Sequence, residues 1–161
     1  MEIFVTNDDG WGAKGILTIV RIMSELGHVT VVAPDGARSG MSNAITVAQP
    51  IYLRPLNDPN WGAEEWQKRV TVYTTNGTPS DCVKLAIDVE CEGDSSKIDL
   101  LVSGINQGSN AGINVIYSGT MGACFVGAEH GIPAIGFSID DHSPKADFSH
   151  MEKYILELTK H

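Results

Sequence analysis

Two adjacent carboxylates, Asp8 and Asp9, stand directly after the first apolar run of the chain, within the sequence VTNDDG at positions 5–10. Neighbouring carboxylates repel each other in one cleft unless a cation lies between them. Their hard oxygen atoms suit Mg²⁺, Mn²⁺ or Ca²⁺, and the histidines and cysteines lack the spacing of a zinc site. A single Asp could simply cap the helix that follows. Two in a row at the end of a strand favour a divalent metal site.

The glycines of the same stretch support a different interpretation. Gly10, Gly12 and Gly15 match the G-x-G-x-x-G pattern of dinucleotide-binding folds. A ribose-binding acid is expected about 20 residues further on, where Asp35 stands. A pyrophosphate, however, binds to bare backbone amides and a helix dipole, and the two preceding carboxylates would repel it. A dinucleotide-dependent oxidoreductase is therefore the alternative to a metal-dependent enzyme.

A segment rich in side-chain amides follows the apolar run 98–103. Asn106, Asn110 and Asn114 recur every fourth residue and are interleaved with glycines. Asn offers a neutral oxygen to a metal or an NH₂ group to a phosphate, and glycine lets the backbone approach a ligand closely. An ordinary turn has a similar composition, but three amides beside a buried strand favour a binding site.

Hydroxyl groups form the remaining part of the predicted site. Ser118, Gly119 and Thr120 stand at the start of a predicted helix, where amides and hydroxyls can bind phosphate or merely cap the helix. The spacing alone does not separate these two roles. Ser39, in a loop rich in Gly and Ser, could offer its oxygen to a metal or its hydroxyl to a phosphate.

Apolar runs that alternate with helical spacing predict an α/β fold. We expect strands at 3–6, 28–33, 50–56, 70–76, 98–103 and 133–139, and helices near 16–26, 78–87, 119–130 and 149–160. This order is typical of a Rossmann-like three-layer fold, in which helices cover both faces of a mostly parallel sheet. Ligands bind beyond the carboxyl ends of such strands, which is where the polar segments described above lie.

Three expectations concern the periphery. In the last helix, we expect Met151, Tyr154, Ile155 and Leu158 to face inward. The polar insertion 57–69, with two Trp residues, is expected to form a surface hairpin tip, although it could stack a base. A second acidic pair, followed by His142, is expected to be a solvated loop.

Composition limits the class of protein. The chain has 161 residues, of which 42% are hydrophobic, and this suits one domain with its own core. Its net charge of −9 argues against a nucleic-acid-binding surface. Three cysteines without metal spacing indicate free thiols in a reducing compartment. The N-terminus has no signal or transit pattern and no apolar run reaches membrane-spanning length, so we expect a cytoplasmic protein without membrane contact.

Six segments together resemble the SurE family, the stationary-phase survival nucleotidases. Their order and spacing cover most of the chain. They are VTNDDG at 5–10, APDGARSGMSNAIT at 33–46, NGTPSDCV at 76–83, DLLVSGINQGSNAG at 99–112, YSGTMGA at 117–123 and GIPAIGFS at 131–138.

The resemblance implies a metal-dependent phosphoric monoester hydrolase that acts on nucleoside 5′- or 3′-monophosphates. The family's metal ligands map onto Asp8, Asp9, Ser39 and Asn106. Its phosphate contacts map onto Asn110, Ser118, Gly119 and Thr120. One of the two Asp carboxylates is expected to orient or deprotonate the attacking water, and an aspartyl-phosphate intermediate on Asp8 is the alternative.

The resemblance also implies a longer chain with an arm used in dimer or tetramer assembly. We therefore expect residues 1–161 to form a single SurE-like domain without the family's C-terminal extension. A homodimer or a higher homo-oligomer is expected if that arm is not required. A catalytically weak nucleotide-binding module is the other alternative to an active phosphatase.

Overall fold

One mixed sheet of six strands organises the chain. The computed structural model describes residues 1–58, 61, 64–143 and 145–160. The strands are ordered β3-β4-β2-β1-β5-β6, and every neighbouring pair is parallel except β3 with β4. The strands are β1 (Glu2–Thr6), β2 (His28–Pro34), β3 (Arg54–Pro55), β4 (Val70–Thr75), β5 (Leu100–Gln107) and β6 (Ala134–Ile139).

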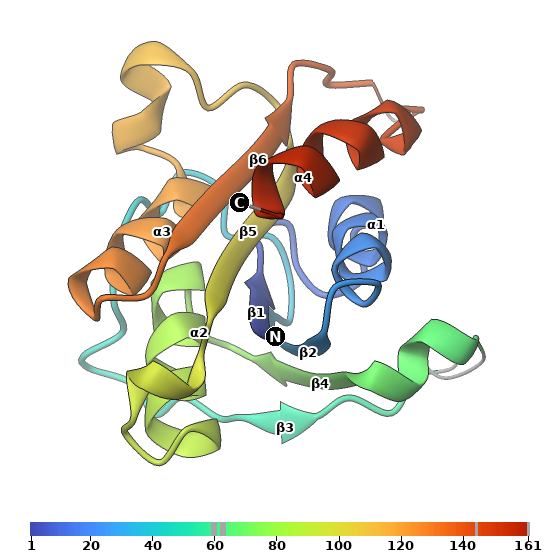
Figure 1. Ribbon diagram of the computed structural model, residues 1–161. Coiled ribbons are helices and arrows are strands. Elements are labelled where there is room, and N and C mark those ends of the chain that lie inside the picture. The colour runs from blue at the N-terminus through green and yellow to red at the C-terminus, as the bar shows by residue number, and fades with distance from the viewer. Residues whose placement is uncertain (59–60, 62–63, 144, 161) are drawn as a thin grey trace.

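Helices lie on both faces of this sheet, so the predicted three-layer fold is confirmed. Helices α1 and α4 cover one face, and α2 and α3 cover the other (Figure 1). The α-helices are α1 (Lys14–Met23), α2 (Pro79–Leu85), α3 (Gly119–Glu129) and α4 (Glu152–Thr159). Shorter helical turns are η2 (Glu65–Arg69), η3 (Ala86–Glu90), η4 (Ser95–Lys97), η5 (Gly112–Ile116) and η6 (Ser149–Met151).

Successive residues of β1 point to opposite faces of the sheet, and each face has its own apolar core. Val5 packs with the buried residues of α1 and with Ile155 of α4. Phe4 packs instead with Val83 of α2 and Ala123 of α3. The central strand is thus buried on both sides, as is typical of parallel sheets.

The predicted start of α2 is confirmed. Thr78 accepts a hydrogen bond from the amide of Asp81 at 3.1 Å, and the Asp81 carboxylate accepts one from the amide of Thr78 at 2.9 Å. Pro79 occupies the first turn, where its missing N–H costs nothing. These contacts fix where β4 ends and α2 begins.

Two strand boundaries differ from the prediction. The predicted strand 50–56 is reduced to the two residues of β3, because Pro55 cannot donate to a ladder and Tyr52 donates its amide to the side chain of Asn76 instead. Strand β5 runs on through Gln107, although the sequence predicts a loop after residue 103. Asn106 therefore lies within a strand and pairs in register with Ser138 of β6.

The inward face of α4 was predicted incorrectly in part. Ile155 is fully buried, but Tyr154 and Leu158 are 56% and 59% exposed. Thr159, one turn after Ile155, is buried in their place. The helical spacing is correct, but the face that meets α1 is rotated relative to the predicted one.

Part of the insertion 57–69 lies outside the described residues, namely 59–60 and 62–63. Within the described part, Trp61 is 7% exposed and belongs to the core beside α1. Trp66 is partly buried against the same core. The expectation of a surface hairpin tip is therefore wrong for these two side chains, because each one covers apolar surface.

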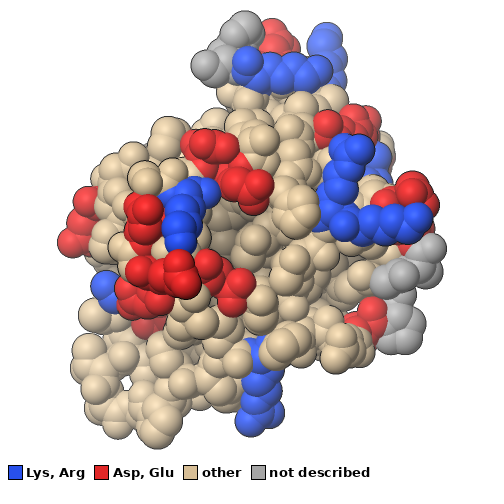
Figure 2. Space-filling model, turned by 60° about the horizontal axis from the view of Figure 1, so that its bottom comes forward, with Lys and Arg blue, Asp and Glu red and all other residues tan. Residues whose placement is uncertain are grey.

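Charges are mixed on the face seen in Figure 2. Among its described residues, most Lys and Arg side chains lie beside Asp or Glu, and they form no continuous basic area. This agrees with the net charge of −9. In the described part of the chain, no helix has both the length and the apolar content to cross a membrane.

Candidate metal and phosphate site

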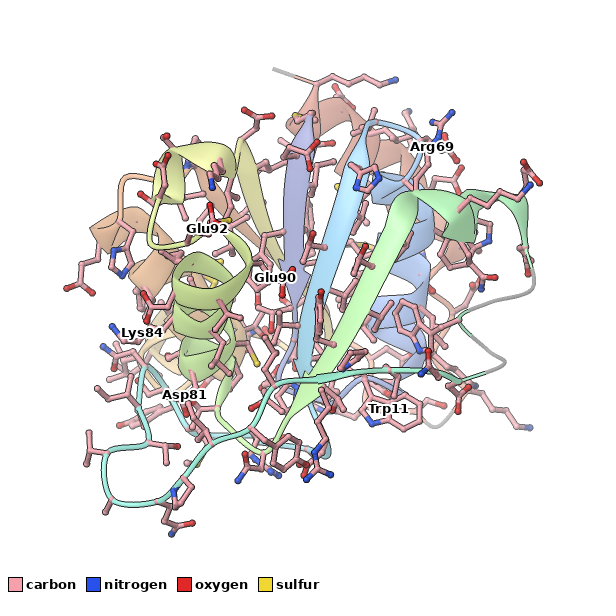
Figure 3. The ribbon with its side chains drawn as sticks, turned by 90° about the horizontal axis from the view of Figure 1, so that it is seen from below. Trp11, Arg69, Asp81, Lys84, Glu90 and Glu92 are labelled. Carbon is pink, nitrogen blue, oxygen red and sulfur yellow. The ribbon has the colours of Figure 1, made fainter. Side chains whose placement is uncertain are left out.

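The predicted site residues lie at or beyond the carboxyl ends of the parallel strands, and Asn106 lies within β5, just before its last residue. Trp11, which follows β1, and Asp81, at the start of α2, lie at this end of the sheet, whereas Arg69 and Glu92 lie at the other end (Figure 3). A cavity of about 420 Å³ opens at that other end, between Phe4 and the turn η3. It is lined by none of the predicted site residues, so the convergence of the loops, rather than a deep pocket, defines the candidate site.

Asp8 is the most buried ionisable group of the site. Its side chain is 4% exposed, and its Oδ1 accepts a hydrogen bond of 2.8 Å from the hydroxyl of Thr120. Burial raises the pKa of Asp8 to about 6, against the lowering effect of Thr120 and with a further increase from the charge of Asp9. A carboxylate held in this state gains strongly from a nearby cation.

Asp9 links the end of β1 to the end of β5. Its Oδ2 accepts a hydrogen bond of 3.5 Å from the backbone amide of Gln107. Burial raises its pKa, partly opposed by that hydrogen bond. The carboxylate therefore lies beside the residue that follows Asn106, as the topological argument predicts.

Asn106 presents one atom that can bind a cation. Its Nδ2 donates to the carbonyl of Gly108 at 2.9 Å. Since the NH₂ group is oriented toward this carbonyl, the Oδ1 atom remains available as a neutral oxygen ligand.

The loop that carries Ser39 is tied to the site through its neighbours. The amide of Arg38 donates to the carbonyl of Asp8 at 2.6 Å. Further along, Thr46 donates its amide and its hydroxyl to Asp81. Although burial alone would raise the pKa of Asp81, these hydrogen bonds and those from Thr78 hold it below its ordinary value. Ser39 itself is exposed and follows directly on the residue anchored to Asp8.

Asn110 provides a buried hydrogen-bond donor without a partner in the described part of the chain. Its Nδ2 atom is inaccessible to solvent and has no hydrogen-bond partner among the described residues. An unpaired buried polar atom is costly and points to a missing partner. A phosphate oxygen would accept this hydrogen bond.

The start of α3 lies against Asp8. A Cβ placed on Gly119 would come within 2.9 Å of the Cβ of Asp8, so only glycine fits there without displacement. Ser118 caps the helix by accepting from the amide of Met121 at 3.1 Å. The O–H of Ser118 and the amides of Gly119 and Thr120, which precede the capped amide, stand at the helix end where an anion can bind.

The glycine pattern has a structural explanation. A Cβ on Gly15 would overlap the carbonyl oxygen of Ile105, so this glycine lets α1 pack directly on β5. Gly10 has a φ of +94° and lies close to Gly36, whereas Gly12 has nothing within 4 Å of its Cβ position. The dinucleotide alternative is therefore not supported, because two of the three glycines serve chain packing.

His142 is a neighbour of the site that the sequence did not indicate. A Cβ on Gly108 would come within 2.7 Å of its Cε1 atom, so the imidazole packs against the backbone between Asn106 and Asn110. The loop 140–143 is exposed, as predicted. The side-chain amide of Gln107 donates a hydrogen bond to the carbonyl of Ser143 and so holds this loop against the end of β5. The adjacent acidic pair was the only local signal for this loop.

The donor set fits a hard divalent cation. The described residues contain no group of three or more His, Cys, Asp and Glu that could hold a metal. Two carboxylates therefore have to be supplemented by neutral oxygens, and Asn106 and Ser39 are among the neutral side chains at the same sheet edge. Oxygen-only coordination suits Mg²⁺, Mn²⁺ or Ca²⁺.

Comparison with known proteins identifies the family of the chain. The family described as "Survival protein SurE" matches residues 3–161. The chain belongs to the SurE family. The sequence resemblance is thereby confirmed over nearly the whole chain.

Relatives of this SurE chain are longer than it is. A protein named 5′-nucleotidase SurE from Porphyromonas gingivalis is 46% identical over 160 residues, which are 99% of this chain and 59% of that protein. One of the same name from Christiangramia forsetii is 49% identical, over 98% of this chain and 57% of that protein. The crystal structure of the SurE protein from Aquifex aeolicus has a TM-score of 0.83 at 32% identity, covering 99% of this chain and 59% of that one. This SurE chain thus spans less than two thirds of each relative.

Proposed function

We propose that this SurE chain is a metal-dependent phosphatase that removes phosphate from nucleoside monophosphates. Relatives named 5′-nucleotidase SurE favour the 5′ position, and the sequence also allowed the 3′ position. Asp8, Asp9, Ser39 and Asn106 would hold the cation. Asn110, Ser118, Gly119 and the backbone amide of Thr120 would surround the phosphate.

One observation carries this proposal. The buried carboxylate of Asp8 and the half-buried carboxylate of Asp9 lie at the same sheet edge as Asn110, whose Nδ2 has no hydrogen-bond partner among the described residues. A cation would offset the negative charge of the two carboxylates, and a phosphate oxygen would accept the hydrogen bond that Asn110 can donate. A phosphomonoester held by a divalent metal supplies both partners at once.

The roles of the residues follow from their donors and acceptors. The Asn110 amide, the Ser118 hydroxyl and the α3 amides donate to phosphate oxygens and stabilise their charge. Asp9 would orient or deprotonate the attacking water, since it is more accessible than Asp8. When bound, the divalent cation lowers the pKa of water and offsets charge on the phosphate. A covalent phosphate on Asp8 is the less favoured variant, because this carboxylate is buried against α3.

Further properties belong to the same proposal. Mg²⁺ and Mn²⁺ suit the all-oxygen donor set best. The described cysteines are free thiols, which supports a reducing, cytoplasmic location. We also propose that residues 1–161 act as one domain within a homodimer or a higher homo-oligomer.

Substrate comparison tests the function. Phosphate release is measured with 5′-AMP, 3′-AMP and p-nitrophenyl phosphate, each with Mg²⁺ or Mn²⁺ added to chelator-treated protein. The proposal expects metal-dependent turnover of at least one mononucleotide. Nucleotide binding without turnover of any of the three esters would instead identify a catalytically weak binding module.

A further inference from the structure

Thr120 has a different environment from the other predicted phosphate contacts. It is the second residue of α3 and is 0% exposed. Its hydroxyl donates to Oδ1 of Asp8 at 2.8 Å, across 112 positions of the chain. A hydroxyl has one proton, so the same group cannot also donate to a phosphate.

This hydrogen bond has a directional consequence for Asp8. Oδ1 accepts the hydrogen bond from Thr120, which leaves Oδ2 as the carboxylate oxygen without a side-chain donor among the described residues. Gly119 packs against the same carboxylate, since a Cβ there would lie 2.9 Å from the Asp8 Cβ and 3.3 Å from Oδ2. Thr120 and Gly119 together restrict the rotation of the Asp8 side chain.

We propose that Thr120 is a positioning residue, which acts through Asp8 rather than by its hydroxyl on the phosphate. It holds Oδ1 so that Asp8 offers Oδ2 alone to the metal. The inference rests on the proposed function, because it takes Asp8 as a metal ligand. Partners that orient a metal ligand commonly change metal affinity by about 10- to 100-fold when removed.

Three substitutions separate this role from simple packing. Thr120→Val keeps the shape and removes the hydroxyl, Thr120→Ala removes the hydroxyl without any added bulk, and Thr120→Ser keeps the hydroxyl. Thr159→Val is the matched control, because the Thr159 hydroxyl is also buried, donates to the carbonyl of Ile155 at 2.7 Å and lies in α4.

The readout is the dissociation constant for Mn²⁺, measured by isothermal titration calorimetry at one pH, with circular dichroism to verify folding. We expect Thr120→Val and Thr120→Ala to bind Mn²⁺ about 10- to 100-fold more weakly. Thr120→Ser should stay within about threefold of the wild type, and Thr159→Val should match it. At saturating Mn²⁺, the KM of the Thr120→Val protein should return close to the wild-type value, because the hydroxyl does not contact the phosphate.

The outcomes separate the two proposals. Wild-type affinity in whichever of the Val and Ala variants folds overturns the positioning role, as does a KM that stays raised at saturating Mn²⁺. A wild-type protein that binds no Mn²⁺ overturns both the positioning role and the proposed function. Mn²⁺ binding that is lost in Asp8→Asn and weakened in Thr120→Val, but without hydrolysis of any ester, overturns the proposed function alone.

Discussion

The backbone amide of Gln107 donates to the carboxylate of Asp9 at 3.5 Å, and this contact joins positions 98 residues apart. It places the acidic pair that ends β1 beside Asn106 near the end of β5. The two strands are adjacent and parallel, so their carboxyl ends meet at one edge of the sheet. The candidate metal site depends on this adjacency.

Replacing either carboxylate of the pair should abolish turnover. Asp8→Asn and Asp9→Asn keep the shape of the side chain but remove a charge that the metal requires, so kcat/KM should fall by at least about 100-fold. Circular dichroism should show a native fold. Asp140→Asn, in the exposed acidic pair after β6, is the matched control and should stay close to wild type. Wild-type turnover in a folded Asp8→Asn protein would refute the metal site.

The metal-free protein should lose stability as pH rises. Burial raises the pKa of Asp8 from an ordinary 3.8 to about 6 in the folded state. Between pH 3.8 and about 6, the native state binds more protons than the unfolded state, so the free energy of unfolding falls as pH rises. The total loss, complete above about pH 6, should reach about 3 kcal/mol. This is measured by urea denaturation in EDTA across pH 4–7.5.

Asp8→Asn isolates the contribution of that one carboxyl group to the pH dependence. The variant lacks the titrating group, so its free energy of unfolding should not show this loss. The difference between variant and wild type should therefore shift in favour of the variant as pH rises from 3.8 to about 6. Parallel stability curves for the two proteins would show that Asp8 does not carry a raised pKa.

The glycines of the G-x-G-x-x-G pattern should differ in their tolerance of a methyl group. Gly15→Ala would force a Cβ onto the carbonyl of Ile105 and should destabilise the fold by about 3 kcal/mol or more. Gly12→Ala has free space around its Cβ and should cost less than about 1 kcal/mol. Thermal denaturation compares the two. Equal and small effects would contradict the packing role of Gly15.

Asn110 should matter for the substrate in a way that Asn114 does not. Asn110→Ala removes the buried donor that has no partner among the described residues, so KM for the mononucleotide should rise about 10-fold or more. Asn114 is exposed and donates to the carbonyl of Ser109 at 3.4 Å, so Asn114→Ala should change KM by less than about twofold. Similar KM values for both variants would remove Asn110 from the phosphate site.

Local patterns in the sequence predicted much of the fold. The helix predicted from residue 78 begins where expected, because the two hydrogen bonds between Thr78 and Asp81 that start it form within one helical turn. The alternation of apolar runs predicted the parallel sheet. The predicted inward face of α4 was partly wrong. Helical spacing indicates that one side of the helix is apolar, but which residues are buried depends on where α1 packs, and Leu158 is exposed.

The residues of the candidate site could be proposed from the sequence, but the contacts between them could not. The adjacency of Asp8 and Asp9 is a local signal, and it indicated a metal without any structure. The hydrogen bond from Thr120 to Asp8 has no such signal, because it depends on the packing of α3 against the end of β1. The approach of His142 to Gly108 likewise depends on the pairing of β5 with β6.

Phosphate release from 5′-AMP is the most direct test of the central claim. The protein is stripped with EDTA and dialysed, and the rate is measured before and after adding Mg²⁺ or Mn²⁺, with an Asp8→Asn, Asp9→Asn double variant in parallel. We predict hydrolysis only by the wild type, and only after metal is added. Full hydrolysis by the stripped wild type, or by the double variant, would contradict a metal-dependent reaction at Asp8 and Asp9.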